Sequence, residues 1–369
     1  MSRTPKRCGE KAVWSRFQIL GKPTLRGKVD EGSEMKMDRL GKWLAEKLGT
    51  APSSIEPLAS DGSTRKFFRV RLGKDTFVVM ENPGQPMEND SYWNIGRHLR
   101  ASGVRVPELY HYDRVEGRIL LQDLGERRLQ DEVSRDRDET RILEIYDLVL
   151  DGLLVLQLGG REGFRAEWCY QGVTYDRRTI LERESSYFLE AFLQGYCGWR
   201  GEKRILLKEF DSLARLAEEL APPRFLIHRD FQSRNILLDS RGRPGIVDFQ
   251  GARLGPLQYD VASLIVDPYV DISPETRGKI LWKYLAKLED SAGISPGDFL
   301  RGYPLVLLHR NLQILGAFSF LGKIQGKGFF LQWIPKAFIH LRDLLEKEDL
   351  PCPALRRAVE DVAPSVLAP

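Results

Sequence analysis

The residues with the clearest chemical meaning lie between 225 and 250. The tripeptide His-Arg-Asp, ending at Asp230, follows a short apolar run, and Asn235 comes five positions after Asp230. Another short apolar run leads directly into Asp248. Transfer of a phosphoryl group to a hydroxyl needs a carboxylate that orients the hydroxyl, and oxygen ligands that hold magnesium ions on the phosphates. The spacing therefore predicts Asp230 as the catalytic base, and Asn235 and Asp248 as Mg²⁺ ligands.

Short strands are expected to position these groups. The apolar residues 225–227, 236–238 and 245–247 each predict a buried strand, and the Gly and Pro within 240–244 predict a turn. Each candidate side chain then lies at or just after the end of a strand, on a loop that can meet a ligand. The alternative is a buried hairpin whose carboxylates only cap loops, as in a catalytically silent relative of a kinase.

Composition describes an ordinary globular protein. The chain has 369 residues, enough for two lobes or one large domain, with 42% hydrophobic and 29% charged residues. Its net charge of +4 is small, and no clear basic stripe predicts nucleic-acid binding. The four cysteines are scattered, which favours a reducing compartment over disulfides. Without a recognisable signal peptide or a bilayer-length apolar run, we expect a cytoplasmic protein with no membrane partner.

Periodicity separates a sheet-rich first part from a helical second part. The first part is expected to contain helices at 38–48 and 88–102 and strands at 68–72, 76–80, 104–110 and 117–122. The second part is expected to contain helices at 138–158, capped by Asp138, and at 177–195, 206–220, 256–267, 274–288, 299–321 and 332–347. Ser273 before Pro274 predicts the start of one of these helices.

This order of elements predicts an α+β, bilobal protein-kinase-like fold with a small antiparallel-sheet N-terminal lobe and a larger, mostly helical C-terminal lobe. The expected boundaries are a basic, disordered extension at 1–34, a nucleotide-binding lobe at 35–122, a hinge at 123–126, a catalytic and acceptor-binding lobe at 127–347, and a loosely held tail at 348–369.

The catalytic stretch resembles a known superfamily. His-Arg-Asp-Phe-Gln-Ser-Arg-Asn, ending at Asn235, together with 247–263, is similar to the aminoglycoside phosphotransferases and choline kinases. Within that superfamily, 59–70, 80–83 and 310–318 resemble the bacterial anomeric kinases that phosphorylate N-acetylmuramate and N-acetylglucosamine at C1. The resemblance covers roughly 38–346. It implies a kinase that uses ATP and Mg²⁺ and phosphorylates a sugar, most specifically at the anomeric hydroxyl.

The resemblance also implies nucleotide-binding residues. Strand 76–80 lacks the lysine with which a typical kinase holds the phosphates, so Arg65 or Lys66 is expected to supply that charge. Gln122 and Leu124, at the hinge, are expected to face the adenine. The expected nucleotide-covering loop contributes Ser60, Gly62, Ser63, Thr64, Arg65 and Lys66.

Polar residues elsewhere are candidates for the acceptor site. Arg310, Asn311 and Gln313 interrupt an apolar helix and either line the acceptor pocket or face solvent. Arg310 would match the lactyl carboxylate of a muramic acid. Gln232 could reach substrate or be solvated. Asp267 could bind sugar hydroxyls or cap a helix end.

Three further residues are expected to support the catalytic loop structurally. These are His228, Arg229 and Asp260, of which Asp260 should accept hydrogen bonds from the loop. Two alternative functions remain open: a kinase for an aminoglycoside, choline or another amino alcohol, and a catalytically silent nucleotide-binding scaffold. A cationic acceptor would call for an acidic pocket, which the Arg310 region mildly disfavours. The sequence does not indicate the oligomeric state.

Overall fold

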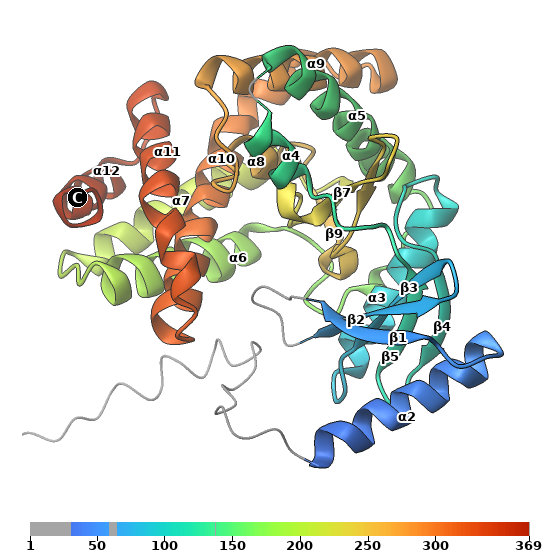
Figure 1. The fold of residues 1–369 in the computed structure, drawn as a ribbon. Coiled ribbons are helices and arrows are strands. Elements are labelled where there is room, and N and C mark those ends of the chain that lie inside the picture. The colour runs from blue at the N-terminus through green and yellow to red at the C-terminus, as the bar shows by residue number, and fades with distance from the viewer. Residues whose placement is uncertain (1–30, 59–64, 137, 369) are drawn as a thin grey trace, which may run out of the picture. The chain divides into compact units, whose positions relative to one another are not determined.

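A computed structural model of the chain describes residues 31–58, 65–136 and 138–368. The expected disordered extension lies outside this range up to residue 30, and a helix begins at Glu31. The chain divides into two compact units, Met1–Asn82 and Pro83–Pro369. Figure 1 labels the helices and strands of each unit. This division falls well before the expected hinge at 123–126, so the lobe boundary at that hinge stays a prediction.

In its described residues, the first unit combines a helix with an antiparallel meander of three strands. Helix α2 spans Glu31–Leu48, followed by β1 (Ser54–Leu58), β2 (Lys66–Leu72) and β3 (Asp75–Glu81). β1 pairs with β2, and β2 with β3. The predicted hairpin of β2 and β3 is confirmed, whereas β1 gives no clear sequence signal. Pro57 lies within β1, which suits a strand at a sheet edge.

The larger unit begins with a helix and a hairpin. Helix α3 (Pro86–Ala101) precedes β4 (Leu109–Asp113) and β5 (Arg118–Gln122), which pair antiparallel. The strand expected at 104–110 is wrong over its first five residues, because the ladder begins only at Leu109. The remaining helices are α4 (Leu129–Arg135), α5 (Glu139–Leu158), α6 (Arg177–Ile180), α7 (Lys203–Leu220), α8 (Gln258–Ile265), α9 (Pro274–Ala292), α10 (Pro296–Ser319), α11 (Ile334–Lys347) and α12 (Pro353–Val366).

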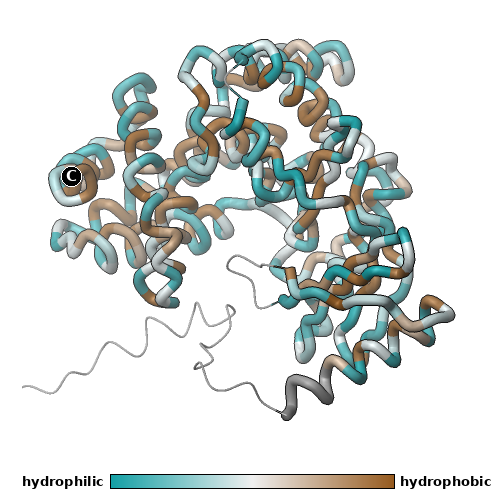
Figure 2. The backbone as a smooth tube through the Cα atoms, viewed as in Figure 1, coloured by the Kyte–Doolittle hydropathy of each residue, from teal (hydrophilic) through white to brown (hydrophobic). Residues whose placement is uncertain are grey.

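Caps and periodicity explain where these helices begin and what they bury. The side chain of Asp138 accepts from the Thr140 amide, and that of Ser273 from the Thr276 amide, so both predicted caps are confirmed. Hydrophobic and hydrophilic residues alternate along the helices of the larger unit (Figure 2). Their apolar faces meet around α10, which packs against α7, α8 and α11.

Helix α10 and its continuation, Pro296–Ile324, correct one expectation from the sequence. This stretch is long and apolar enough to cross a membrane, but most of its apolar window is buried inside the protein. Its neighbours on several sides are other helices of the same unit. The long apolar run is therefore explained by a position in the core.

The tail expected to be loosely held is instead an ordered helix. α12 packs against α7 and α11 and buries Leu355, Val359 and Val362. Its first turn is anchored because both carboxylate oxygens of Glu209 accept backbone hydrogen bonds, at 2.8 Å from Ala354 and 2.7 Å from Leu355. The expectation of a loose tail is wrong, since Pro and Ala at its start are compatible with a first helical turn.

Four short strands carry the catalytic stretch. β6 (Phe225–Ile227) pairs with β9 (Arg253–Gly255), and β7 (Ile236–Leu238) pairs with β8 (Pro244–Ile246). Three of these strands are predicted from the sequence, with β8 one residue earlier than expected, while β9 is not. Both pairings are antiparallel.

Candidate active site

The residues 228–235, which contain Asp230 and Asn235, are called the catalytic loop below, and Asp260 anchors the start of this loop. Its two carboxylate oxygens accept the backbone N–H groups of His228, at 2.7 Å, and Arg229, at 2.9 Å. The side chain is fully buried at the start of α8, and burial raises the pKa of Asp260 to about 6. These are the contacts that the sequence predicts for Asp260.

Asp267 anchors the end of the same loop. Its carboxylate accepts the Ser233 amide at 2.7 Å and the Tyr269 amide at 2.9 Å. Asp267 is only 1% exposed. Since both oxygens are used by backbone donors, the structure favours a bracing role for Asp267 over direct sugar binding.

His228 and Arg229 connect the loop to its surroundings. Nε2 of His228 lies 3.0 Å from the Val247 carbonyl, one residue before Asp248, so it ties the two halves of the site together. The Arg229 guanidinium donates to the side-chain oxygen of Gln171. Arg229 also has a φ of 82°, in the left-handed region that non-glycine residues rarely adopt. The supporting role expected of both residues stays a prediction, and these contacts agree with it.

The carboxylate of Asp230 lies against the guanidinium of Arg310. Nη2 of Arg310 is 3.5 Å from Oδ1 of Asp230, whose side chain is one-third exposed. Burial raises the pKa of the Asp230 carboxyl, but the charges of Arg229 and Arg310 more than offset this and hold it below its usual range. Asp230 is therefore a carboxylate at neutral pH, as an orienting base requires.

Arg310 does not face solvent, which excludes one of its two expected environments. It is 2% exposed, and its guanidinium lies 5.6 Å from the ring centre of Tyr259. Nη1 donates to Oε1 of Gln313 at 2.5 Å, so Gln313 orients Arg310. Both side chains thus belong to the surroundings of the base, a contact that the helical pattern alone does not predict.

Asn311 points away from the base. With its amide oriented to satisfy its neighbours, Nδ2 donates to the Ala337 carbonyl at 3.0 Å and Oδ1 accepts from the Leu341 amide at 3.2 Å. These backbone groups are four residues apart in α11, where one would normally bond the other. Asn311 therefore joins α10 to α11, and its expected place in the acceptor pocket is not supported.

Asn235 and Asp248 present oxygen atoms suited to magnesium. Nδ2 of Asn235 donates to the backbone oxygen of Asp230 at 2.9 Å, which leaves its amide oxygen as the acceptor. Asp248 has a φ of 68° and accepts from Nε2 of Gln250 at 3.2 Å. One amide oxygen and one carboxylate fit a Mg²⁺ ion that takes its other ligands from phosphates and water. Within the described ranges, no cluster of three His, Cys, Asp or Glu side chains offers a fuller metal cage.

Helix α3 packs directly on the residue after Asp248. The rings of Tyr92 and Phe249 lie 4.6 Å apart, and Oγ of Ser91 donates to the Gln250 carbonyl at 2.8 Å. A Cβ atom at Gly96 would lie 2.8 Å from Phe249, so glycine is needed for this approach. Sequence reasoning missed this contact, although a glycine inside an amphipathic helix is a signal of close packing.

Six of the expected nucleotide-binding residues belong to the expected nucleotide-covering loop. Ser60, Gly62, Ser63 and Thr64 lie outside the described residues. Arg65 is 6% exposed beside the ring of Phe67, whereas Lys66 is exposed at the start of β2. The roles of all six stay predictions.

At the expected hinge, two side chains contact neighbouring backbone. Oε1 of Gln122 accepts from the Glu108 amide at 3.3 Å. Leu124 packs on Gly245 of β8, where a Cβ atom would lie 2.8 Å from its side chain. The side chain of Gln232, three residues before Asn235, is partly exposed, and the backbone N–H of Gln232 donates to the backbone carbonyl of Asp230 at 3.0 Å. The ligand-binding roles of Gln122, Leu124 and Gln232 stay predictions.

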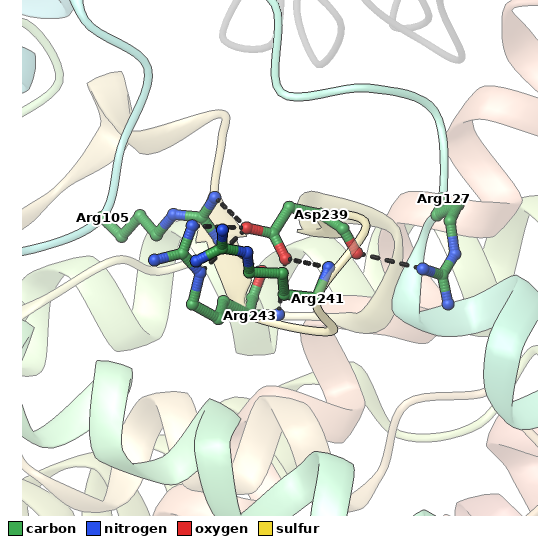
Figure 3. A network of polar contacts seen from close by, with 5 residues as sticks. All are labelled: Arg105, Arg127, Asp239, Arg241 and Arg243. Atoms are coloured by element: carbon green, nitrogen blue, oxygen red, sulfur yellow. Dashed lines mark hydrogen bonds and ion pairs between the residues drawn. The ribbon is translucent and has the colours of Figure 1, made fainter.

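A polar network holds the hairpin of β7 and β8 to the chain around Arg105 and Arg127. Figure 3 shows this Asp239 clamp, which consists of Arg105, Arg127, Asp239, Arg241 and Arg243. Arg105 pairs with the Asp239 carboxylate at 2.8 Å, and Arg127 donates to the Asp239 carbonyl at 3.0 Å. The backbone repeats the same links, because Leu238 donates to the Arg127 carbonyl and Ile246 to the Arg105 carbonyl. Both ends of the segment 105–127 are therefore fastened to the hairpin of β7 and β8.

Two solved structures of small-molecule kinases have a similar fold. A thermostable mutant of aminoglycoside phosphotransferase APH(4)-Ia, in its apo form, matches with a TM-score of 0.54 and 18% identity, covering 82% of this chain and 98% of that one. Choline kinase LicA from Streptococcus pneumoniae matches with a TM-score of 0.56 and 14% identity, covering 84% and 99%. At these identities the likeness concerns the fold alone, and it confirms the predicted kinase-like α+β fold.

Sequence comparison gives nearer relatives. The N-acetylmuramate/N-acetylglucosamine kinase of Pseudomonas aeruginosa is 32% identical over 307 residues, which cover 81% of this chain and 86% of that protein. The kinase of the same name from Neisseria meningitidis is 29% identical over 311 residues, covering 82% and 89%. The model of the phosphotransferase enzyme family matches residues 54–294, more than half of the chain. With the kinase-like fold and the Asp230 site, these matches show that the chain belongs to the phosphotransferase enzyme family and transfers phosphate to a hydroxyl acceptor.

Proposed function

We propose that this protein is an ATP- and Mg²⁺-dependent kinase for the anomeric C1 hydroxyl of N-acetylmuramate, N-acetylglucosamine or a closely related amino sugar. The observation that carries the proposal is the Asp230 carboxylate, held ionised beside Arg310 and within one hydrogen-bonded loop with Asn235. The names of the relatives supply the acceptor class. We place the reaction in the cytoplasm, where ATP is available.

The residues in and around the catalytic loop have different roles in phosphoryl transfer. Asp230 accepts a hydrogen bond from the acceptor hydroxyl and takes its proton as the phosphoryl group is transferred. An anomeric hydroxyl is more acidic than an ordinary alcohol, so a carboxylate of low basicity is sufficient. Asp260 and Asp267 fix both ends of the loop, which keeps Asp230 in one orientation. Mg²⁺, held by Asn235 and Asp248, would neutralise charge on the phosphates.

The charges around Asp230 favour a neutral or anionic acceptor. Arg229 and Arg310 both lower its pKa through their positive charge. A cationic aminoglycoside or choline would need negative charge that these guanidinium groups offset. This is why an amino sugar is proposed ahead of those acceptors. Arg65 or Lys66 remains our candidate for balancing the phosphates of ATP.

An acceptor screen with a blocked sugar tests the proposal. The purified full chain is assayed for ATP consumption with N-acetylmuramate, N-acetylglucosamine, other hexoses, aminoglycosides and choline. The 1-O-methyl glycoside of N-acetylglucosamine is the matched negative control, because its anomeric oxygen carries no proton. We expect turnover with the two free sugars, phosphate at C1 by ³¹P NMR, and none with the glycoside. Turnover of the glycoside at the same rate would place the phosphate on another hydroxyl and contradict the proposal.

A further inference from the structure

Glu184 is a buried carboxylate whose partners are two tyrosines. It is 2% exposed, and its oxygens accept the hydroxyl of Tyr175 at 2.6 Å and that of Tyr259 at 2.9 Å. It lies in a π-helical turn, Leu181–Ser185, and such wide turns are frequent at functional sites. Burial raises the pKa of Glu184 to about 7, which shows that its environment is unfavourable for an ordinary carboxylate.

One of the two tyrosines connects Glu184 to the base. The ring of Tyr259 lies 5.6 Å from the Arg310 guanidinium, within the range of a cation–π contact. The same guanidinium also lies near Asp230, with Nη2 3.5 Å from Oδ1. A hydroxyl that donates to a carboxylate makes its own ring more electron-rich, since hydrogen-bonded chains polarise one another. Glu184 therefore strengthens the face on which Arg310 rests.

The arginine and carboxylate charges around the catalytic loop also link Glu184 to Asp230. The Arg310 guanidinium lies 3.5 Å from Asp230. Burial raises the pKa of the Asp230 carboxyl, and the positive charges of Arg229, Arg310 and Arg253 lower it. Asp260 is committed to two backbone amides of the loop. Glu184 is a further carboxylate in this cluster, and the charges of Arg310 and Arg229 both lower its pKa.

We propose that Glu184 is a positioning residue for phosphoryl transfer, acting through Tyr259 to hold Arg310 against Asp230. The proposal rests on the role of Asp230 as the base. The competing explanation is that Glu184 only satisfies two buried hydroxyls. The two tyrosines separate these explanations. Tyr175 is 3% exposed and Tyr259 is 1% exposed, and their rings are 4.6 Å apart, but it is the ring of Tyr259 that contacts Arg310.

The test compares Tyr259→Phe with Tyr175→Phe. Each change removes one hydroxyl from Glu184 and keeps the ring, so any effect on thermal unfolding should be similar. We expect Tyr259→Phe to lower kcat about ten- to a hundredfold, the usual consequence of losing a charge-assisted hydrogen bond, with KM for ATP within about twofold. Tyr175→Phe should leave kcat within about threefold. Equal losses of kcat in both variants would overturn the proposal.

A double-mutant comparison examines whether the effect passes through Arg310. Glu184→Gln should lower kcat in the normal chain, but have little further effect in an Arg310→Ala background, because coupled residues are not additive. An undiminished effect in that background would also overturn the proposal. The measurements use whichever hydroxyl acceptor the unmodified enzyme phosphorylates fastest. A wrong assignment of the sugar therefore contradicts the proposed function without affecting this test.

Discussion

Replacing Asp260 with asparagine would test whether one buried carboxylate holds the catalytic loop. The wild-type side chain accepts two backbone N–H groups, at 2.7 and 2.9 Å, in a site closed to solvent. Asparagine keeps one acceptor oxygen and places an NH₂ group against the other N–H. Loss of one charge-assisted bond costs about 1.5–3 kcal/mol, and a buried donor without a partner costs about 1–3 kcal/mol. Removing a carboxylate that is itself unfavourably buried offsets part of this sum.

We therefore expect Asp260→Asn to lower the free energy of unfolding by about 2–4 kcal/mol, a large part of a typical total of about 5–15 kcal/mol. Equilibrium urea unfolding, followed by circular dichroism, measures this change. Asp290→Asn, at an exposed position of α9, is the matched control and should stay within about 0.5 kcal/mol of the unmodified chain. A loss below about 1 kcal/mol for Asp260→Asn would refute the inference that these two bonds hold the loop.

Four further outcomes are expected. Asp230→Asn should cut turnover at least about a hundredfold without moving the urea midpoint, and near-normal turnover would exclude it as the base. Asp248→Ala should abolish Mg²⁺-dependent turnover while thermal unfolding stays unchanged, and retained magnesium-dependent activity would point to other ligands. Arg310→Ala should reduce kcat/KM for N-acetylmuramate and N-acetylglucosamine by similar factors, because Arg310 contacts the base; a loss confined to N-acetylmuramate would instead indicate recognition of its carboxylate. Backbone hydrogen bonds from Arg243 and Arg241, with the Arg243 guanidinium, hold the pKa of Asp239 well below its usual range. The stability that Asp239 provides is therefore fully present above the ordinary aspartate pKa of about 3.9 and is lost progressively as pH falls from there through the lower folded-state pKa. The difference in urea unfolding between Asp239→Asn and the unmodified chain should therefore begin to shrink as pH falls from about 5 to about 3.

The catalytic centre is predictable because its residues are close in sequence. Asp230, Asn235 and Asp248 lie on loops between short strands, and their spacing alone limits the chemistry. The contact of Arg310 with Asp230 is not predictable in this way, because it joins residues eighty positions apart through helix packing. A polar step in an apolar helix signals that Arg310 needs a partner, but not which partner it finds.

Other features escape the sequence for different physical reasons. Glu184 lies among ordinary charged residues, and only the fold brings Tyr175 and Tyr259 to its oxygens. The tail beyond 348 looks irregular because of its prolines, yet Glu209 caps the first turn of α12 from a distant helix. Long, strongly amphipathic helices were the most predictable elements, since their burial pattern repeats over many turns.

The Asp239 clamp has a consequence for local unfolding. Arg105 and Arg127 fasten both ends of the β4–β5 hairpin segment to the hairpin of β7 and β8, through side chains and backbone. The amide protons of Leu238 and Ile246 are enclosed in these links, so they can exchange with solvent only when the clamp opens. We therefore expect the two hairpins to behave as one cooperative unit, in which the segment that leads to the expected hinge and the segment that carries Asn235 and Asp248 open together.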